Sequence, residues 1–169
     1  MALASFHYAF DSRDALMRAG IDHVIAGEEQ AAAAASESSD DVRGIIAGAL
    51  RGYLRLLRSR PGHEQAVLEL FHYSLRTEEL SQLPEQQYAA YRRAVGALLI
   101  AAAERAGIRW SLPVDDVARL VVSFTDGLTL SWLADRDDAA AERFVSAAID
   151  MIAGLATAAS DADTEGSDS

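Results

Sequence analysis

The stretch from Pro113 to Asp135 constrains the fold more than any other part of this chain. It reads PVDDVARLVVSFTDGLTLSWLAD, with no further proline after its first residue. Pro113 suits a first helical turn, and Asp115 and Asp116 follow where carboxylates favour the positive end of the helix dipole. The stretch therefore predicts one helix of roughly 30 Å, about the width of a small domain.

The surface of this predicted helix is mostly apolar. An ordinary surface helix buries an apolar arc of about 100° or a little more, and this helix offers much more than that. It must be covered on two sides, one by the core of its own domain and the other by a second cover, for which a partner chain is the obvious candidate. Its polar positions form one narrow stripe of Asp116, Arg119, Ser123 and Asp126.

The rest of the chain also has helical patterns. No segment shows the sustained alternation of β-branched residues that is typical of a strand. The sequence therefore predicts an all-α fold. A helix begins at Asp11 or Ser12 and fades in residues 31–39, and residues 77–84 form a connector with a short helical turn. The later predicted helices cover about 41–59, 63–76, 85–106 with Gly107 ending it, 113–135, and a last one capped by Asp137 that runs to about 158.

The last two predicted helices form a hairpin. Only Ala134 to Asp137 link them, and so short a link makes them antiparallel neighbours. Two such hairpins that face each other across a twofold axis would form a four-helix interface between identical chains. The alternative is a monomeric bundle in which both helices are central. The residues expected at the dimer interface are Leu120, Ser123, Gly127, Leu130, Trp132, Ala148 and Ile152.

Composition narrows the class of protein. The chain has 169 residues, of which 50% are hydrophobic and 24% charged, as in a soluble globular domain. Its net charge of −11 argues against broad nucleic-acid binding by the chain as it stands. The longest apolar run, residues 94–103, is too short to span a bilayer, and no signal segment begins the chain. We expect a cytoplasmic protein without membrane contact.

Motifs for catalysis or metal binding are missing from the sequence. There is no Cys, no G-x-S-x-G setting for a serine nucleophile, no HExxH and no Gly-rich phosphate loop. The adjacent acidic pairs at 78–79 and 137–138 point to different sides of a helix and do not converge. We therefore expect neither an enzyme nor a metal site, and no cofactor.

Three groups of residues carry a resemblance to a known family. Residues 5–16, SFHYAFDSRDAL, resemble the end of the DNA-binding region of the TetR/AcrR family of bacterial transcriptional regulators. Residues 70–77 (LFHYSLRT) and 126–135 (DGLTLSWLAD) resemble the C-terminal ligand and dimerisation domain of the same family. The resemblance covers about residues 2–156. It implies a TetR-like helical bundle with a C-terminal two-helix dimerisation hairpin.

The resemblance also implies a division of the chain. Residues 1–28 would be the remnant of a helix-turn-helix domain, residues 29–158 the ligand-binding and dimerisation domain, and residues 159–169 a disordered acidic tail. Family members have two helices and most of a third before the part seen here, so we expect either a start assigned too late or a truncated member. The resemblance assigns His7, Tyr8 and Arg13 to phosphate contacts with DNA. The alternative is an exposed His7 beside aromatic residues that pack the small N-terminal domain.

In this family an effector lies among the middle helices. Pockets of this kind are mostly apolar with a few placed polar groups, so we expect a small hydrophobic or amphipathic ligand. The same aromatic residues would equally suit a plain core. The residues expected to bind the ligand are Tyr53, Leu57, Leu68, Phe71, His72, Leu75, Tyr88, Tyr91, Phe124, Thr125 and Leu128.

Two functions follow from these observations. The first is a ligand-responsive repressor that acts as a homodimer on operator DNA once the upstream helices are present. The second is a stand-alone helical module that binds a ligand and dimerises without touching DNA.

Overall fold

The computed structural model describes residues 40–159, with the side chain of Glu79 left out. The all-α prediction is confirmed, since helices make up most of this part of the chain. The DNA-contact residues His7, Tyr8 and Arg13, the segment 1–28 and the tail from residue 160 lie outside the described residues. The elements are α3 (Val42–Ser59), α4 (Pro61–Ser74), the short 3-10 helix η1 (Glu78–Leu80), α5 (Leu83–Ala106), β1 (Ile108–Trp110), α6 (Val114–Asp135), α7 (Asp138–Ala153) and β2 (Ala156–Ala158).

The ends of the helices follow from capping residues. The carboxylate of Asp41 accepts from the backbone N–H of Gly44 at 3.2 Å and begins α3. Asp137 does the same for α7, accepting from Ala140 at 2.9 Å. Gly107 ends α5 in the left-handed conformation, with φ at 62°, which a glycine adopts without steric cost.

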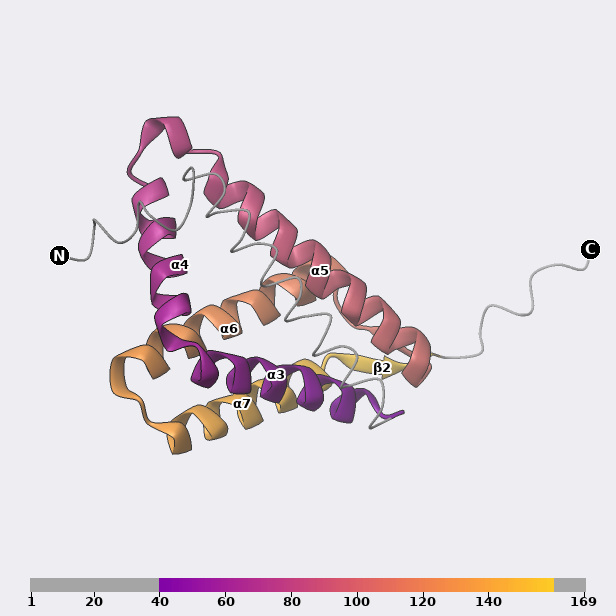
Figure 1. The fold of residues 1–169 in the computed structure, drawn as a ribbon. Helices are drawn as coiled ribbons and strands as arrows, with labels where there is room; N and C mark the ends of the chain where they lie inside the picture. The colour runs from indigo at the N-terminus through magenta and orange to yellow at the C-terminus, as the bar shows by residue number, and fades with distance from the viewer. Residues whose placement is uncertain (1–39, 160–169) are drawn as a thin grey trace, which may run out of the picture.

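Helix α6 lies in the middle of the fold (Figure 1). It contacts α5 along one side and α7 along another, while α3 runs beside α7. Helix α4 leads away from the end of α3 to η1, and α5 returns from there, so that α3, α4 and α5 outline a triangle in this view. The most completely buried side chains join α3, α6 and α7 in one core and include Leu54, Leu57, Val117, Val145 and Ile152.

Two short strands correct the prediction of helices alone. Strand β1 pairs with β2 in an antiparallel register that sets Ile108 opposite Ala158 and Trp110 opposite Ala156. Helix α7 therefore ends at Ala153, and the prediction that it continues to about residue 158 is wrong for the last residues. The strands follow α5 and α7 respectively, so their pairing fastens the ends of these two helices to each other.

Helix α6 is a longer apolar segment than the run of residues 94–103 considered in the sequence. By length and composition alone it could cross a membrane, and it is the one such helix among residues 40–159. A core helix of a soluble protein passes the same test. The buried face of α6, which includes Val117, Val122 and Trp132, packs within the core of this chain. That packing accounts for part of its apolar character, since Leu120 and Leu130 on the same helix stay exposed.

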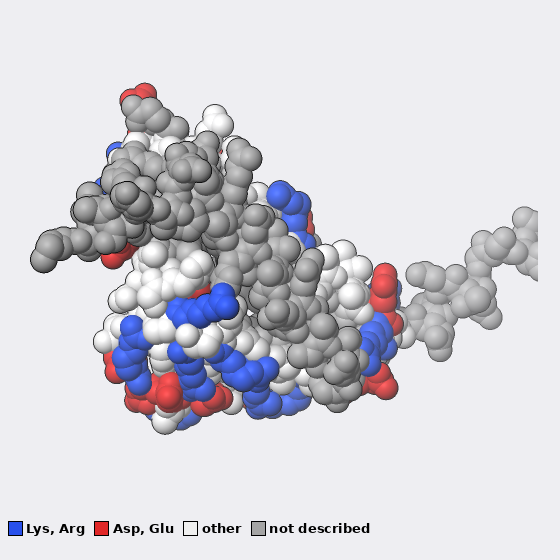
Figure 2. All heavy atoms as spheres, viewed as in Figure 1, with Lys and Arg blue, Asp and Glu red and all other residues white. Residues whose placement is uncertain are grey.

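A polar cluster joins α3 to the beginning of α7. The guanidinium of Arg58 donates to the carboxylates of Asp138 and Glu142, each at 2.8 Å. The indole N–H of Trp132 donates to the same Asp138 carboxylate at 2.8 Å. These bonds hold the pKa of Asp138 below its usual range, with the contact to Trp132 as the main cause. Figure 2 shows Arg and acidic side chains gathered together at this end of the molecule.

Candidate ligand pocket and exposed hairpin face

A cavity lies among α3, α4, α5 and α6. Its volume is about 180 Å³, far more than the roughly 10–15 Å³ that one water molecule requires. Its wall is mostly aliphatic and aromatic, which is typical of a site for a small organic molecule. Four helices therefore leave between them a space that their own side chains do not fill.

The residues expected to bind a ligand divide between this cavity and other places. Leu57 and Leu128 are buried in the core, and Phe124 packs against Phe144 with ring centroids 5.9 Å apart. His72 and Leu75 are exposed. The predicted residues that line the cavity are Tyr53, Leu68, Phe71, Tyr88, Tyr91 and Thr125.

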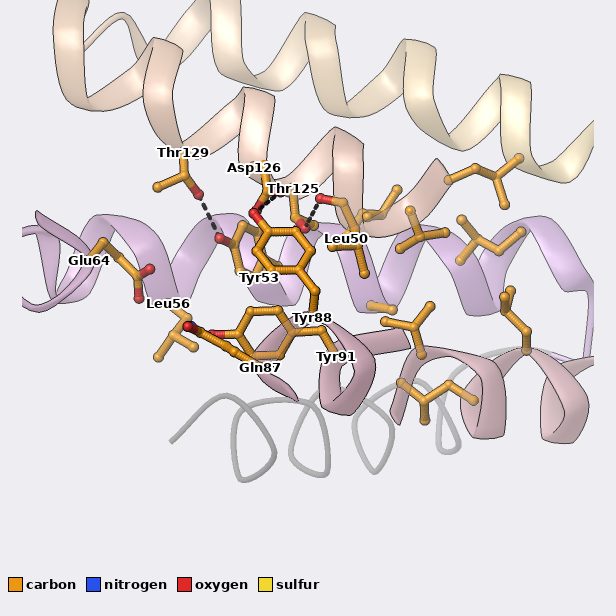
Figure 3. Close-up of a pocket in the computed structure, with 18 of the residues that line it drawn as sticks. Leu50, Tyr53, Leu56, Glu64, Gln87, Tyr88, Tyr91, Thr125, Asp126 and Thr129 are labelled. Carbon is orange, nitrogen blue, oxygen red and sulfur yellow. Dashed lines mark hydrogen bonds between the residues drawn. The ribbon is translucent and has the colours of Figure 1, made fainter. Parts of the chain in front are cut away.

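Hydrogen bonds tie the polar groups of the cavity to one another (Figure 3). The hydroxyl of Tyr53 on α3 lies 2.6 Å from the hydroxyl of Thr129 on α6. The hydroxyl of Tyr88 on α5 donates to a carboxylate oxygen of Asp126 on α6 at 2.7 Å. Both bonds end on the same face of α6, so they join α3 and α5 to that helix across the cavity.

Burial changes the acid–base properties of these groups. It raises the pKa of the Asp126 carboxyl above its usual value, although the hydrogen bond from Tyr88 acts in the opposite direction. It also raises the pKa of the Glu64 carboxyl on α4, and burial is the cause there too. The hydroxyls of Tyr53 and Tyr88 have raised pKa values, again mainly through burial, and stay protonated at neutral pH.

Sequence reasoning missed four polar residues of the wall. Glu64 stands on the same face of α4 as Val67, Leu68 and Phe71, at helical spacing, and a single charge in an apolar face is a signal that the sequence does contain. Asp126 was assigned to the polar stripe of α6, but it is half-buried and lines the cavity. The missed polar residues are Glu64, Gln87, Asp126 and Thr129.

No metal centre is formed by this part of the protein. Within residues 40–159 no group of three His, Cys, Asp or Glu side chains is arranged to hold a metal ion. The chemistry that the cavity offers is hydrogen bonding and ionic contact inside an apolar wall.

The hairpin of α6 and α7 has a second, outward face. Leu120 and Leu130 are exposed on α6, as is Ser123 between them. Phe144 and Met151 are exposed on α7. The tip of the Phe144 ring lies 3.9 Å from the position that a Cβ on Gly127 would occupy, so this side chain of α7 packs over Gly127 of α6. We call this outward face, with Leu120, Ser123, Leu130, Phe144 and Met151, the hairpin face.

The residues expected at a dimer interface fall on both sides of the hairpin. Trp132, Ala148 and Ile152 are buried in the core of the single chain, with exposed fractions of 7%, 3% and 1%. They lie beneath the hairpin face, in the core that joins α3, α6 and α7. Those that reach or adjoin the surface are Leu120, Ser123, Gly127 and Leu130.

Comparison with known proteins supports these observations. Residues 43–157 match the family of C-terminal domains of BetI-type transcriptional repressors. The chain is also similar to the HTH-type nicotine-responsive transcriptional repressor HdnoR of Paenarthrobacter nicotinovorans. The two are 26% identical over 137 residues, which cover 81% of this chain and 70% of the relative. No solved structure matches the chain.

The family match covers more than half of the chain and spans every helix that carries the cavity. The members of this family regulate transcription and are not enzymes. The family match therefore agrees with the prediction that this protein is not an enzyme. The chain belongs to the TetR family of transcriptional repressors and carries a BetI-type C-terminal domain.

Proposed function

We propose that this protein is a ligand-responsive repressor that acts as a homodimer on operator DNA. The cavity among α3 to α6 is the effector site, and the hairpin face is the surface between the two subunits. In this proposal residues 29–158 form the sensor and dimerisation unit, and residues 1–28 belong to the DNA-binding part, with His7, Tyr8 and Arg13 as phosphate contacts.

One observation carries the proposal, which is that α6 lines the cavity with one side and exposes apolar residues on another. Thr125, Asp126 and Thr129 line the cavity, while Leu120 and Leu130 are exposed on another side of the same helix. A ligand that shifts α6 would therefore act on the subunit interface as well. Recognition helices of a dimer must match half-sites about one DNA turn apart, so a change at the interface weakens DNA binding.

The similarity to a repressor named for its response to nicotine supports ligand control. It is a statement about that relative, and we extend only the general point that a small molecule controls repression. The pocket residues in this proposal are those of the wall, with Tyr53, Phe71 and Tyr88 as its aromatic part.

The dimer is tested by sedimentation velocity on the purified chain and two variants. In Leu130→Asp a charge replaces a side chain that is 51% exposed on the hairpin face. We expect a dimer for the unchanged chain and a dimer at least roughly tenfold weaker for this variant, because an unpaired charge would be buried between subunits. Ile100→Asp on α5, at 50% exposure, is the matched control and should stay dimeric. Equal dimerisation of both variants would refute the hairpin face as interface.

DNA binding is tested by selecting duplexes from a random pool with the chain preceded by the upstream helices that complete the helix-turn-helix. We expect enrichment of twofold-symmetric sequences that a ligand releases. The stand-alone module is the alternative, and it predicts a stable dimer with a functional pocket but no enriched duplex.

A further inference from the structure

The wall of the cavity contains negative charge without a positive charge to balance it. Glu64 and Asp126 both line the space, and no Arg, Lys or His from the described residues does so. A carboxylate that is withdrawn from water costs free energy unless a cation or hydrogen-bond donors compensate it. The two carboxylates therefore raise the free energy of the empty pocket, and a ligand with a positive charge or hydrogen-bond donors would lower it.

Glu64 is the less satisfied of the two carboxylates. Its side chain makes no hydrogen bond or ion pair with another residue of the described part of the chain. Asp126 accepts from Tyr88 through one oxygen, and its other oxygen has no donor among the same residues. Both carboxylates act on the hydroxyl of Tyr53, whose pKa each of them helps to raise, so both lie near that group.

Gln87 provides an independent observation. Its side chain is only 4% exposed, and its carbonyl oxygen is buried without a hydrogen-bond partner. Its amide nitrogen is already used, because it donates to the hydroxyl of Tyr91. In Figure 3 the amide end of Gln87 points toward the end of the cavity at which Glu64 lies. A buried acceptor without a donor carries a cost of its own, which a ligand with an N–H group would remove.

Aromatic rings surround the same space. The rings of Phe71 and Tyr88 lie 5.2 Å apart and those of Tyr88 and Tyr91 5.8 Å apart, in tilted pairs. Ring faces attract cations and also pack well against an apolar body. The wall thus combines unpaired acceptors, negative charge and aromatic surface.

Taking the cavity as the effector site of the proposed function, we propose that the effector is a protonated amine on a compact apolar body. The ammonium group donates to Glu64, which is its main counter-ion, and to the carbonyl oxygen of Gln87. Asp126 adds negative potential and a further acceptor. The apolar body packs among Phe71, Tyr88 and Tyr91.

Other ligand classes fit the wall less well. A carboxylic acid would bring another negative charge beside Glu64 and Asp126, where like charges repel. A neutral alcohol can donate only one hydrogen bond and brings no positive charge to pair with the carboxylates. A quaternary ammonium has the charge but no N–H group to donate to Gln87.

Isothermal titration of the full chain tests the proposal with probes that share one apolar body. These are phenylbutylamine, the alcohol phenylbutanol, the acid phenylbutyrate and the N-trimethylated phenylbutylammonium. We expect the amine to bind at least roughly tenfold more tightly than the alcohol, because the ammonium adds an ion pair with the carboxylate and further N–H donors that a hydroxyl does not have. The quaternary probe should bind more weakly than the amine, and the acid weakest of all.

Three variants locate the charge recognition. Glu64→Gln should weaken amine binding roughly tenfold and leave alcohol binding unchanged, since it removes charge at constant shape. Asp126→Asn should weaken amine binding less, because Glu64 is the main counter-ion and the Asn amide oxygen still accepts from Tyr88. Glu69→Gln, on an exposed face of the same helix α4, is the matched control and should bind the amine like the unchanged chain.

The outcomes separate this inference from the proposed function. If the alcohol or the acid binds as tightly as the amine, or if Glu64→Gln binds the amine normally, the amine assignment is wrong while the effector pocket stands. If the quaternary probe matches the amine, donation to Gln87 is wrong. If none of the probes binds, the effector pocket itself is refuted, and the proposed function with it.

Discussion

The two sides of α3 face parts of the molecule that are built differently. On one side Leu54 and Leu57, at 1% and 0% exposure, pack against α6 and α7 in a filled core. On the other side Tyr53 and Leu56 border the cavity toward α4 and α5. Neighbouring positions of one helix thus belong to a packed half and a hollow half of the same small domain.

The packed half and the hollow half also treat polar groups differently. Around α7 the polar side chains pair with each other, as Arg58 does with Asp138 and Glu142. Around the cavity the carbonyl oxygen of Gln87 is buried without a donor, and the half-buried carboxylate of Glu64 accepts no hydrogen bond from the described residues. Natural cores satisfy nearly all their buried polar groups, so exceptions call for an explanation. Under the proposed function, this difference means that the packed half supplies stability and that the hollow half gives some of it up for binding the effector.

The largest expected effect comes from removing the same side chain in each half. Leu57→Ala should lower the free energy of unfolding by about 2–5 kcal/mol, since it opens a cavity in a filled core. Leu68→Ala on α4 enlarges a cavity that already exists and should cost roughly half of that or less. Urea denaturation followed by circular dichroism measures both values. Equal losses would mean that the hollow half is packed as tightly as the other.

A smaller effect is expected from the bond that spans the cavity between α3 and α6. Tyr53→Phe leaves the Thr129 hydroxyl without its partner at 2.6 Å, and should cost about 1–2 kcal/mol of unfolding free energy. Thr129→Val should cost a similar amount.

The double variant is the control for that bond. If the two hydroxyls interact directly, the combined loss is smaller than the sum of the single losses. Additive losses by the same denaturation measurement would contradict the contact.

Sequence patterns predicted the helices well because their signals are local. Asp41 and Asp137 cap α3 and α7, and Gly107 ends α5, as their positions in the sequence predict. The two strands were missed for the opposite reason. Ile108 pairs with Ala158, far along the chain, and neither three-residue segment is long enough to show an alternating pattern.

The pocket was predicted only in part, for a reason that lies in packing. Spacing along a helix tells which residues share a face, and so Tyr53, Phe71 and Tyr88 could be chosen. It does not tell which of two apolar faces meets a filled core, and Leu57 and Leu128, which were expected to bind the ligand, lie in that core and do not line the cavity. The distinction depends on how α4 and α5 sit against α6, which no local pattern contains.

A still smaller effect is expected in the packed half, at its polar surface. Arg58→Gln should lower the free energy of unfolding by no more than about 1 kcal/mol, because both partner carboxylates are well exposed. High salt should shrink the loss further, since salt screens exposed charges. Arg55→Gln, on an exposed position of the same helix, is the matched control and should have no effect. A large loss that salt does not change would show that the cluster acts through packing.

The smallest expected effect is a change in melting temperature with pH that depends on Glu64, and it is the effect most specific to the hollow half. Burial raises the pKa of this carboxyl in the folded chain above its value in the unfolded chain. The contribution of protonated Glu64 to the free energy of unfolding is therefore fully present below the pKa of the unfolded chain. It is lost as the pH rises through the pKa of the folded chain. Glu64→Gln cannot lose a proton, so it should melt at the same temperature as the unchanged chain in acid and slightly higher at neutral pH.

Thermal melts of both proteins across this pH range, without ligand, measure that difference, and Asp126 titrates equally in both. Glu69→Gln is exposed on the same helix and should show no such trend. A variant that gains stability at neutral pH while it loses affinity for an amine would mark Glu64 as a residue kept for binding at the expense of the fold. A loss of stability at neutral pH would instead mean that an unseen donor satisfies Glu64, and the contrast between the packed half and the hollow half would then fail at its most polar point.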